Sequence, residues 1–131
     1  MAFAADVAKV LFPFNRILIY LPVVRTETMK LSSIAFARAL EHFDSRWPEI
    51  EAAMREEDLV ILTADHGNDP TYPGTDHTRE YAPLIVFGKR ARRGVNLGTH
   101  ASLADIGQTI ADNFGTNLTA GESFLTQITS R

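Results

Sequence analysis

The sequence predicts an α/β fold in which helices flank a mostly parallel sheet. Two short apolar runs, at residues 59–64 and 83–88, are bounded by polar residues and have the length and composition of buried strands. An amphipathic segment with helical spacing precedes the first run, at 36–54, and another follows the second run, at 103–114. Strands that alternate with helices are typical of a sheet with helices packed against it.

Length and composition limit the class of protein. The 131 residues suffice for one domain, and 45% hydrophobic with 22% charged residues is typical of a soluble globular chain. A net charge of -3 excludes a strongly basic nucleic-acid-binding protein. The absence of cysteine excludes disulfides and thiolate metal sites and fits a reducing compartment, so we expect a cytoplasmic location. One short basic cluster is expected to be a solvated loop: Lys89, Arg90, Arg92 and Arg93.

The apolar stretches of the first 20 residues do not predict a membrane span or a signal peptide. Polar residues interrupt them, and no basic segment precedes an apolar run with a small-residue cleavage site. We expect instead a short helix at 2–11, broken by Pro13, and a strand at 16–21.

The two helical patterns carry further signals. In the first, apolar residues at 36, 40, 43, 47, 50 and 54 form one stripe, and Pro48 predicts either a kink or a restart of the helix. In the second, Ser102 and Asp105 resemble a capping box, and Gly115 stands where a C-terminal cap is expected. The stripe of this helix is Leu103, Ile106, Ile110 and Phe114, and the expected anchors of the last segment are Phe124, Leu125 and Ile128.

Candidate metal ligands follow the strand at 59–64. Asp65 and His66 come directly after it, and a long polar loop, which contains His77, extends to Glu80. Ligands bind at the carboxyl ends of strands in open α/β sheets, and oxygen and nitrogen ligands without sulfur suit Mn²⁺, Zn²⁺ or Mg²⁺. An isolated Asp-His pair is also typical of a capping Asp beside a surface His. The strand before the pair, the Gly after it and the second His favour a metal site.

The loop also carries a family resemblance. Residues 63–84, TADHGNDPTYPGTDHTREYAPL, resemble phosphopentomutases of the alkaline phosphatase superfamily. The shorter TADHGN also resembles cofactor-independent phosphoglycerate mutases, whereas GTDHTREY at 74–81 is more specific. LADIGQTIA at 103–111 and GESFL at 121–125 extend the resemblance, which covers roughly 34–128.

This resemblance implies an isomerase of nucleoside catabolism that interconverts the 1- and 5-phosphates of ribose or 2-deoxyribose. In the family, two metal ions, usually Mn²⁺, support phosphoryl transfer through a phosphorylated threonine. The resemblance assigns Asp65 and His66 to one ion and His77 to the other. Residues 34–131 then form the C-terminal part of an alkaline-phosphatase-like metal-binding core, and residues 1–33 are a divergent segment.

Several parts of the family pattern are missing. The nucleophilic threonine, an N-terminal aspartate ligand and the cap domain precede the matched region, so we expect a fragment without catalytic residues and without activity by itself. The two family ligands that share an ion with His77 are replaced by Val24 and Met29, so we expect at most a partial metal site. A separate N-terminal half is a candidate partner, alongside the sugar phosphate.

The other polar residues of the loop region have two interpretations each. Asp69 and Asp76 either orient the ligand imidazoles or make local backbone hydrogen bonds. Arg79 either positions a phosphate or pairs with Glu80, and we favour the pairing.

Two histidines outside the loop and two other functions complete the expectations. His42 is expected to be solvated, and His100 to serve a loop or a cap. The other functions that we consider are a non-catalytic α/β module or pseudoenzyme, and a phosphomonoesterase of the same superfamily.

Overall fold

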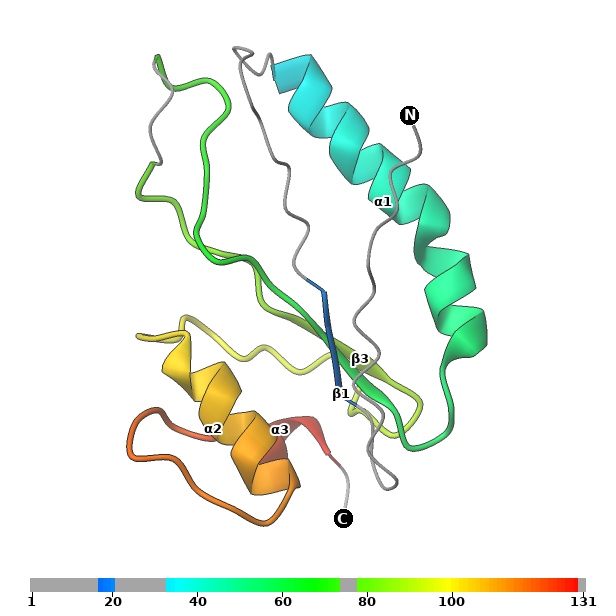
Figure 1. Ribbon diagram of the computed structural model, residues 1–131, viewed down its shortest axis with the longest axis vertical. Coiled ribbons are helices and arrows are strands. Elements are labelled where there is room, and N and C mark those ends of the chain that lie inside the picture. Colours follow the sequence, from blue (N-terminus) through cyan, green and yellow to red (C-terminus); the bar gives the residue numbers. More distant parts are fainter. Residues whose placement is uncertain (1–16, 21–32, 74–77, 130–131) are drawn as a thin grey trace.

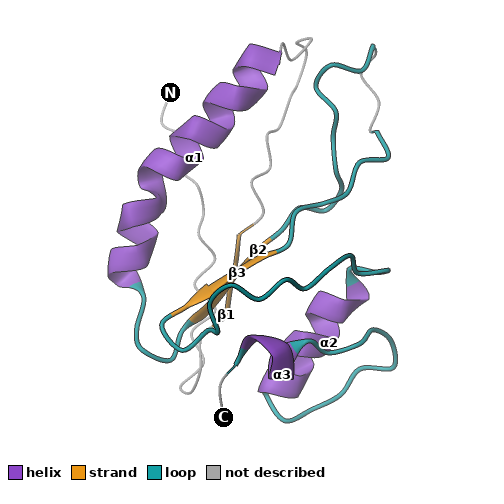
Figure 2. Cartoon of the chain, turned by 180° about the vertical axis from the view of Figure 1, so that it is seen from behind, coloured by secondary structure: helices purple, strands orange, loops and turns teal. Residues whose placement is uncertain are grey.

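A three-stranded sheet with helices on both sides forms the framework of the chain. The computed structural model describes residues 17–20, 33–73 and 78–129. The sheet order is β1 (Ile17–Tyr20), β2 (Leu59–Leu62) and β3 (Ile85–Gly88). Figures 1 and 2 show helix α1 (Ser33–Ala53) on one side of the sheet, and α2 (Ala104–Asn113) and α3 (Leu125–Ile128) on the other. The predicted α/β layering is confirmed, whereas the helix expected at 2–11 lies outside the described residues.

The sheet is mixed rather than mostly parallel. β1 pairs with β2 in parallel, and the connection between them includes α1, as a parallel crossover requires. β3 runs antiparallel to β2, so the expectation of a mostly parallel sheet is wrong for this strand. No described helix lies between β2 and β3, and the chain returns to the edge at which β2 ended. An antiparallel strand is the consequence.

β2 is buried on both faces, as its apolar run predicts. Leu59 and Ile61 belong to the core cluster on the α2 and α3 side. Val60, which alternates with them, is 1% exposed. The second predicted strand is less buried than expected, because Ile85 of β3 is 48% exposed.

Helix α1 continues through Pro48 instead of restarting there. It reaches the sheet through Trp47, whose ring centroid lies 4.5 Å from that of Phe87 in β3. The expected stripe is only partly buried, and Leu40 is 52% exposed. The packing of Trp47 on Phe87 is therefore one contact that attaches α1 to the sheet.

The N-terminus of α2 differs from the expected capping box. The Ser102 hydroxyl accepts the N–H of Ala104, and the Asp105 carboxylate is used elsewhere. The expected apolar stripe is partly wrong as well, since Leu103 and Phe114 are 50% and 43% exposed. The residues of α2 that are buried are Asp105, Ile106, Thr109 and Ala111, of which only Ile106 belongs to the expected stripe.

The end of α2 and the last segment follow the expectations. Gly115 has a φ of 69°, and the N–H of Thr116 donates to the carbonyl of Ala111, which is the pattern of a Schellman cap. Phe124 is fully buried and Ile128 is 3% exposed, so both anchor the segment as predicted, with Leu125 packed against the same cluster.

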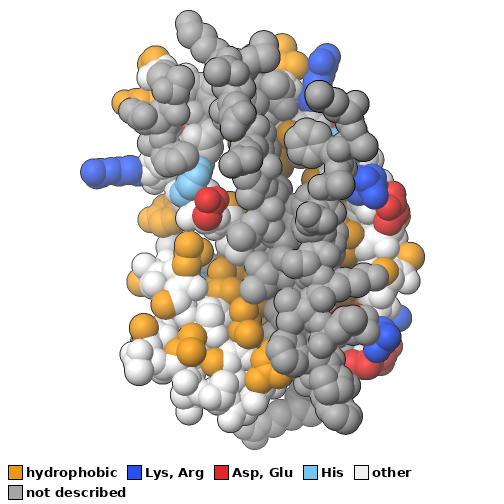
Figure 3. Space-filling model, in the orientation of Figure 1, with side chains coloured by type: hydrophobic (Ala, Val, Ile, Leu, Met, Phe, Trp, Pro, Cys, Tyr) orange, Lys and Arg blue, Asp and Glu red, His pale blue; other side chains and the backbone are white. Residues whose placement is uncertain are grey.

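The surface around α2 and α3 is rich in apolar side chains. In Figure 3, hydrophobic side chains gather over the half of the molecule that contains these helices. Leu103, Phe114 and Leu118 are among the exposed ones. Within the described ranges, none of the helices combines the length and the apolar character that crossing a membrane requires.

Candidate metal centre

Asp65 and His66 lie just beyond the carboxyl end of β2. The strand ends at Leu62, and Thr63, which is 6% exposed, continues the buried backbone to the edge of the sheet. The Asp65 and His66 side chains then emerge into solvent, with exposed fractions of 70% and 39%. Oδ1 of Asp65 and Nε2 of His66 are 3.8 Å apart. Two adjacent residues therefore present an oxygen and a nitrogen donor side by side.

The imidazole of His66 is held in one tautomer. Its Nδ1 lies 2.8 Å from the carbonyl oxygen of Gly67. Because a carbonyl oxygen only accepts hydrogen bonds, Nδ1 carries the proton, and the lone pair of the neutral ring is on Nε2. Nε2 is the nitrogen nearest the Asp65 carboxylate, so the ring is oriented as a ligand needs to be.

The loop after His66 folds back on itself. The N–H of Asp69 donates to the hydroxyl of Thr78 at 2.7 Å. Gly67 packs so closely against the backbone of Glu80 that a Cβ at this position would overlap the Glu80 carbonyl. Residues 65–69, the outgoing arm, therefore lie against residues 78–80, the return arm.

The Asp69 carboxylate makes local hydrogen bonds. Its Oδ1 accepts the hydroxyl of Thr71 at 2.6 Å and the N–H of Thr71 at 2.8 Å. These two bonds, the hydroxyl first, lower the pKa of Asp69 below its ordinary value. Of the two interpretations of Asp69, the local backbone role is the one observed.

The structure describes only some of the other predicted site residues. His77 and Asp76 lie outside the described residues, as do Val24 and Met29. Arg79 is exposed, and the expected ion pair with Glu80 does not occur between these two described residues. In the part of the chain that the structure describes, no three His, Cys, Asp or Glu side chains are close enough together to hold a metal ion.

Two expectations about exposed groups are confirmed. His42 is exposed on α1. The residues of the basic cluster are also exposed, namely Lys89, Arg90, Arg92 and Arg93.

His100 takes part in a cluster around the buried Asp105 and Phe124 that the sequence did not predict. Its Nδ1 lies 2.8 Å from Oδ2 of Asp105, and its ring packs on Phe124 with centroids 5.0 Å apart. Oδ1 of Asp105 accepts the N–H of Glu122. This backbone hydrogen bond and then the one to His100 lower the pKa of Asp105. A signal was present, because Asp105 falls on a helix face beside buried apolar positions where an unpaired carboxylate is costly.

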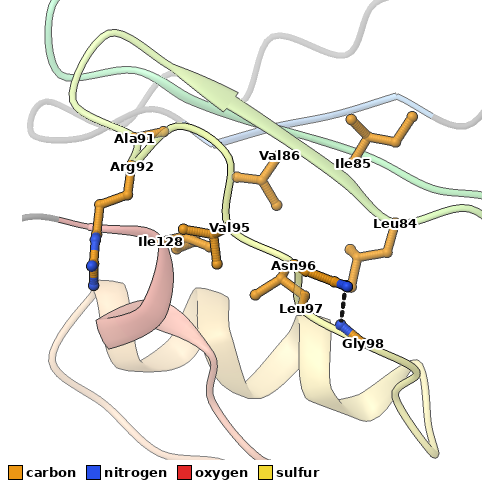
Figure 4. A pocket seen from close by; sticks show the side chains of 10 residues that line it. All are labelled: Leu84, Ile85, Val86, Ala91, Arg92, Val95, Asn96, Leu97, Gly98 and Ile128. Carbon is orange, nitrogen blue, oxygen red and sulfur yellow. Dashed lines mark hydrogen bonds between the residues drawn. The ribbon is translucent and has the colours of Figure 1, made fainter.

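A separate cavity of about 230 Å³ lies beside β3. Figure 4 shows Val86, Val95, Leu97 and Ile128 converging on it, while the Arg92 side chain extends away from this group. The Asn96 side chain is occupied by the N–H of Gly98. The lining combines these apolar side chains with polar surface, and it shares no residue with the Asp65 and His66 site.

Comparison with known proteins relates this geometry to a family. The profile described as "Metalloenzyme superfamily" matches residues 32–118, which include β2, both loop arms and β3. The chain belongs to the metalloenzyme superfamily. Asp65 and His66 thus stand at a strand end within a domain of a metal-dependent superfamily, which supports a metal cofactor.

Individual relatives narrow the comparison. A phosphopentomutase of Clostridioides difficile is 56% identical over 90 residues, which are 68% of this chain and 23% of the relative. Those of Symbiobacterium thermophilum and Vibrio cholerae are 54% and 56% identical, over 71% and 69% of this chain and 24% and 22% of their own lengths. The resemblance to phosphopentomutases is confirmed. The chain spans less than a quarter of the length of these relatives.

Proposed function

We propose that this chain carries part of the metal centre of a phosphopentomutase-type enzyme, in a partial alkaline-phosphatase-like core that begins near residue 34. The reaction of the whole centre is the interconversion of ribose or 2-deoxyribose 1-phosphate and 5-phosphate. The observation that carries this proposal is the pairing of Asp65 Oδ1 with His66 Nε2 at the end of β2. The relatives, each named a phosphopentomutase, favour this reaction over phosphomonoester hydrolysis.

The donor atoms fit a divalent ion. Ligand atoms at about 2.0–2.2 Å from an ion can lie up to about 4.4 Å apart, and the observed separation is 3.8 Å. Carboxylate oxygen and imidazole nitrogen suit Mn²⁺, which we propose as the cofactor. When bound, such an ion neutralises phosphoryl oxygens and lowers the pKa of an attacking hydroxyl. The chain itself holds Asp65 and His66 at the strand end, and the Nδ1–H of His66 donates a hydrogen bond to the Gly67 carbonyl.

A second ion is assigned to His77 within the same proposal. Its neighbour Thr78 is held against the outgoing arm by the Asp69 N–H. Two ligands would be needed to complete this second site, but Val24 and Met29 stand at the positions where the family carries them. We propose that the part of the relatives that lies outside the matched region corresponds to the source of the remaining ligands and the nucleophile of the complete centre.

A non-catalytic α/β module is the second candidate function. It is favoured by one observation, which is that no group of three ligands is assembled among the described residues. A module that keeps the loop for structural reasons has no need of a metal ion. Metal binding therefore separates the two candidates.

Calorimetric titration with Mn²⁺ tests the proposal. We expect weak binding by the unsubstituted chain, because an ion with two protein ligands retains most of its water. Asp65→Ala is expected to abolish the binding heat, whereas Asp44→Ala, which removes an exposed carboxylate from α1, leaves it unchanged. Absence of binding by the unsubstituted chain contradicts the proposal and leaves the non-catalytic module.

A further inference from the structure

We infer that Thr78 is a positioning residue for the Asp65 and His66 pair. This inference rests on the metal site proposed above and adds a residue that does not itself bind the ion. The Thr78 hydroxyl accepts the N–H of Asp69 at 2.7 Å across the loop. Among the described residues, this hydrogen bond to a side chain joins the return arm to the outgoing arm.

The contact acts on His66 through Gly67. Gly67 lies between His66 and the bonded Asp69, and its backbone packs against Glu80, two residues beyond Thr78. The Gly67 carbonyl is also the group that accepts the hydrogen bond from the Nδ1–H of His66. If the arms separate, this carbonyl is free to rotate, and the imidazole loses the bond that keeps the lone pair on Nε2. Thr78 therefore controls the ligand through the backbone of the outgoing arm.

Among the described residues, the Thr78 hydroxyl is the acceptor that the Asp69 N–H uses. The Asp69 carboxylate, the closest alternative by sequence, is engaged with the hydroxyl and the N–H of Thr71. Valine at position 78 keeps the shape of threonine and lacks the acceptor, whereas serine keeps the acceptor. Loss of one such hydrogen bond reduces the population of the ordered loop, and the apparent Mn²⁺ affinity is expected to fall about three- to ten-fold.

Thr71 offers a matched control. It lies in the same loop and also forms a hydrogen bond with Asp69. Its hydroxyl donates to the Asp69 carboxylate, which belongs to the outgoing arm, so this bond does not involve the return arm. Thr71→Val is the same chemical change without the loss of a contact between the arms. Its Mn²⁺ affinity is expected to remain within about two-fold of the unsubstituted chain.

The test measures Mn²⁺ affinity and the ¹⁵N shifts of the His66 ring in Thr78→Val, Thr78→Ser and Thr71→Val. We expect Thr78→Val to weaken binding, and its metal-free ring to become a mixture of tautomers, while Thr78→Ser and Thr71→Val resemble the unsubstituted chain. Equal affinity and an unchanged tautomer in Thr78→Val overturn the inference, and so does an equal loss in Thr71→Val.

The two proposals fail in different ways. If the unsubstituted chain binds no Mn²⁺, the metal site itself is wrong, and the ring shifts of the metal-free protein still decide whether Thr78 positions His66. If the unsubstituted chain binds Mn²⁺ and Thr78→Val binds equally well, the metal site stands and the positioning role is wrong.

Discussion

Gly67 lies against the backbone of Glu80 so closely that no side chain fits between them. This contact brings the end of β2 and the chain leading into β3 together beside Asp65 and His66. The lack of a Cβ, and not the left-handed backbone that glycine often provides, is what the position requires. The geometry of the candidate metal centre thus depends on a backbone contact between residues that are not ligands.

Gly67→Ala is expected to open the loop and abolish Mn²⁺ binding. The added methyl group meets backbone atoms that cannot move alone, and overpacking of this kind costs about 1–3 kcal/mol. Calorimetric titration and thermal unfolding measure the two effects. Gly107→Ala is the control, because its Cβ meets only the end of the Leu118 side chain and alanine favours the helix. Unchanged Mn²⁺ binding in Gly67→Ala contradicts a role for this contact.

Local sequence patterns predicted the strands, the cap at Gly115 and the anchors Phe124 and Ile128, because each depends on a few neighbouring residues. The direction of β3 was not predictable in this way, since it depends on the path of the loop between the strands. The partners of the buried Asp105 were missed for the same reason. His100 approaches from a loop and Glu122 from a distant segment.

The candidate ligands were recognisable because the strand and the adjacent Asp65 and His66 are contiguous in sequence. Their support was not, because Thr78 and Glu80 contact the outgoing arm only after the chain has folded back. Hydrogen bonds between distant segments leave no periodic signal in the sequence.

Asp105 is expected to make stability depend on pH in the acid range. Its pKa is lowered in the folded chain, chiefly by the Glu122 N–H and then by His100. The stabilisation is therefore complete above the unfolded pKa of about 3.9 and is lost as pH falls through the lower folded pKa. Urea unfolding from about pH 7 to about pH 3 measures the loss.

Glu49 and Asp69 also have lowered pKa values, so they contribute to the loss of stability in acid. Variants are therefore needed to assign part of this loss to Asp105. Asp105→Asn is expected to be less stable at neutral pH and to show a shallower loss of stability in acid. Asp44→Asn, on exposed α1, is expected to follow the unsubstituted chain. An acid transition that is equally steep in Asp105→Asn contradicts the assignment.

Thr109→Val is expected to destabilise the last segment. The fully buried Thr109 hydroxyl donates to the Asp105 carbonyl at 2.7 Å and accepts the N–H of Phe124 at 3.0 Å. Valine fills the space but leaves the Phe124 N–H buried without an acceptor, at a cost of about 1–3 kcal/mol. Urea unfolding measures this cost against Thr119→Val, an exposed position. Equal stability of the two variants is the contrary outcome.

The isolated chain is expected to show no mutase activity on ribose 1-phosphate, even with Mn²⁺ and a bisphosphate activator. Phosphoryl transfer through a covalent intermediate needs a nucleophile, and none is assigned to this chain. A coupled assay for ribose 5-phosphate, with a full-length phosphopentomutase as the positive control, measures the activity. Mn²⁺-dependent turnover by pure protein contradicts the expectation and requires a nucleophile within these 131 residues.

The central claim is that Asp65 and His66 are the residues of this chain that bind the metal ion, and that His77 contributes little to the binding. The most direct measurement is the electron paramagnetic resonance signal of free Mn²⁺ during titration of His66→Ala, His77→Ala and the unsubstituted chain. The expected result is that His66→Ala abolishes binding while His77→Ala retains most of it. A larger loss in His77→Ala than in His66→Ala contradicts the claim.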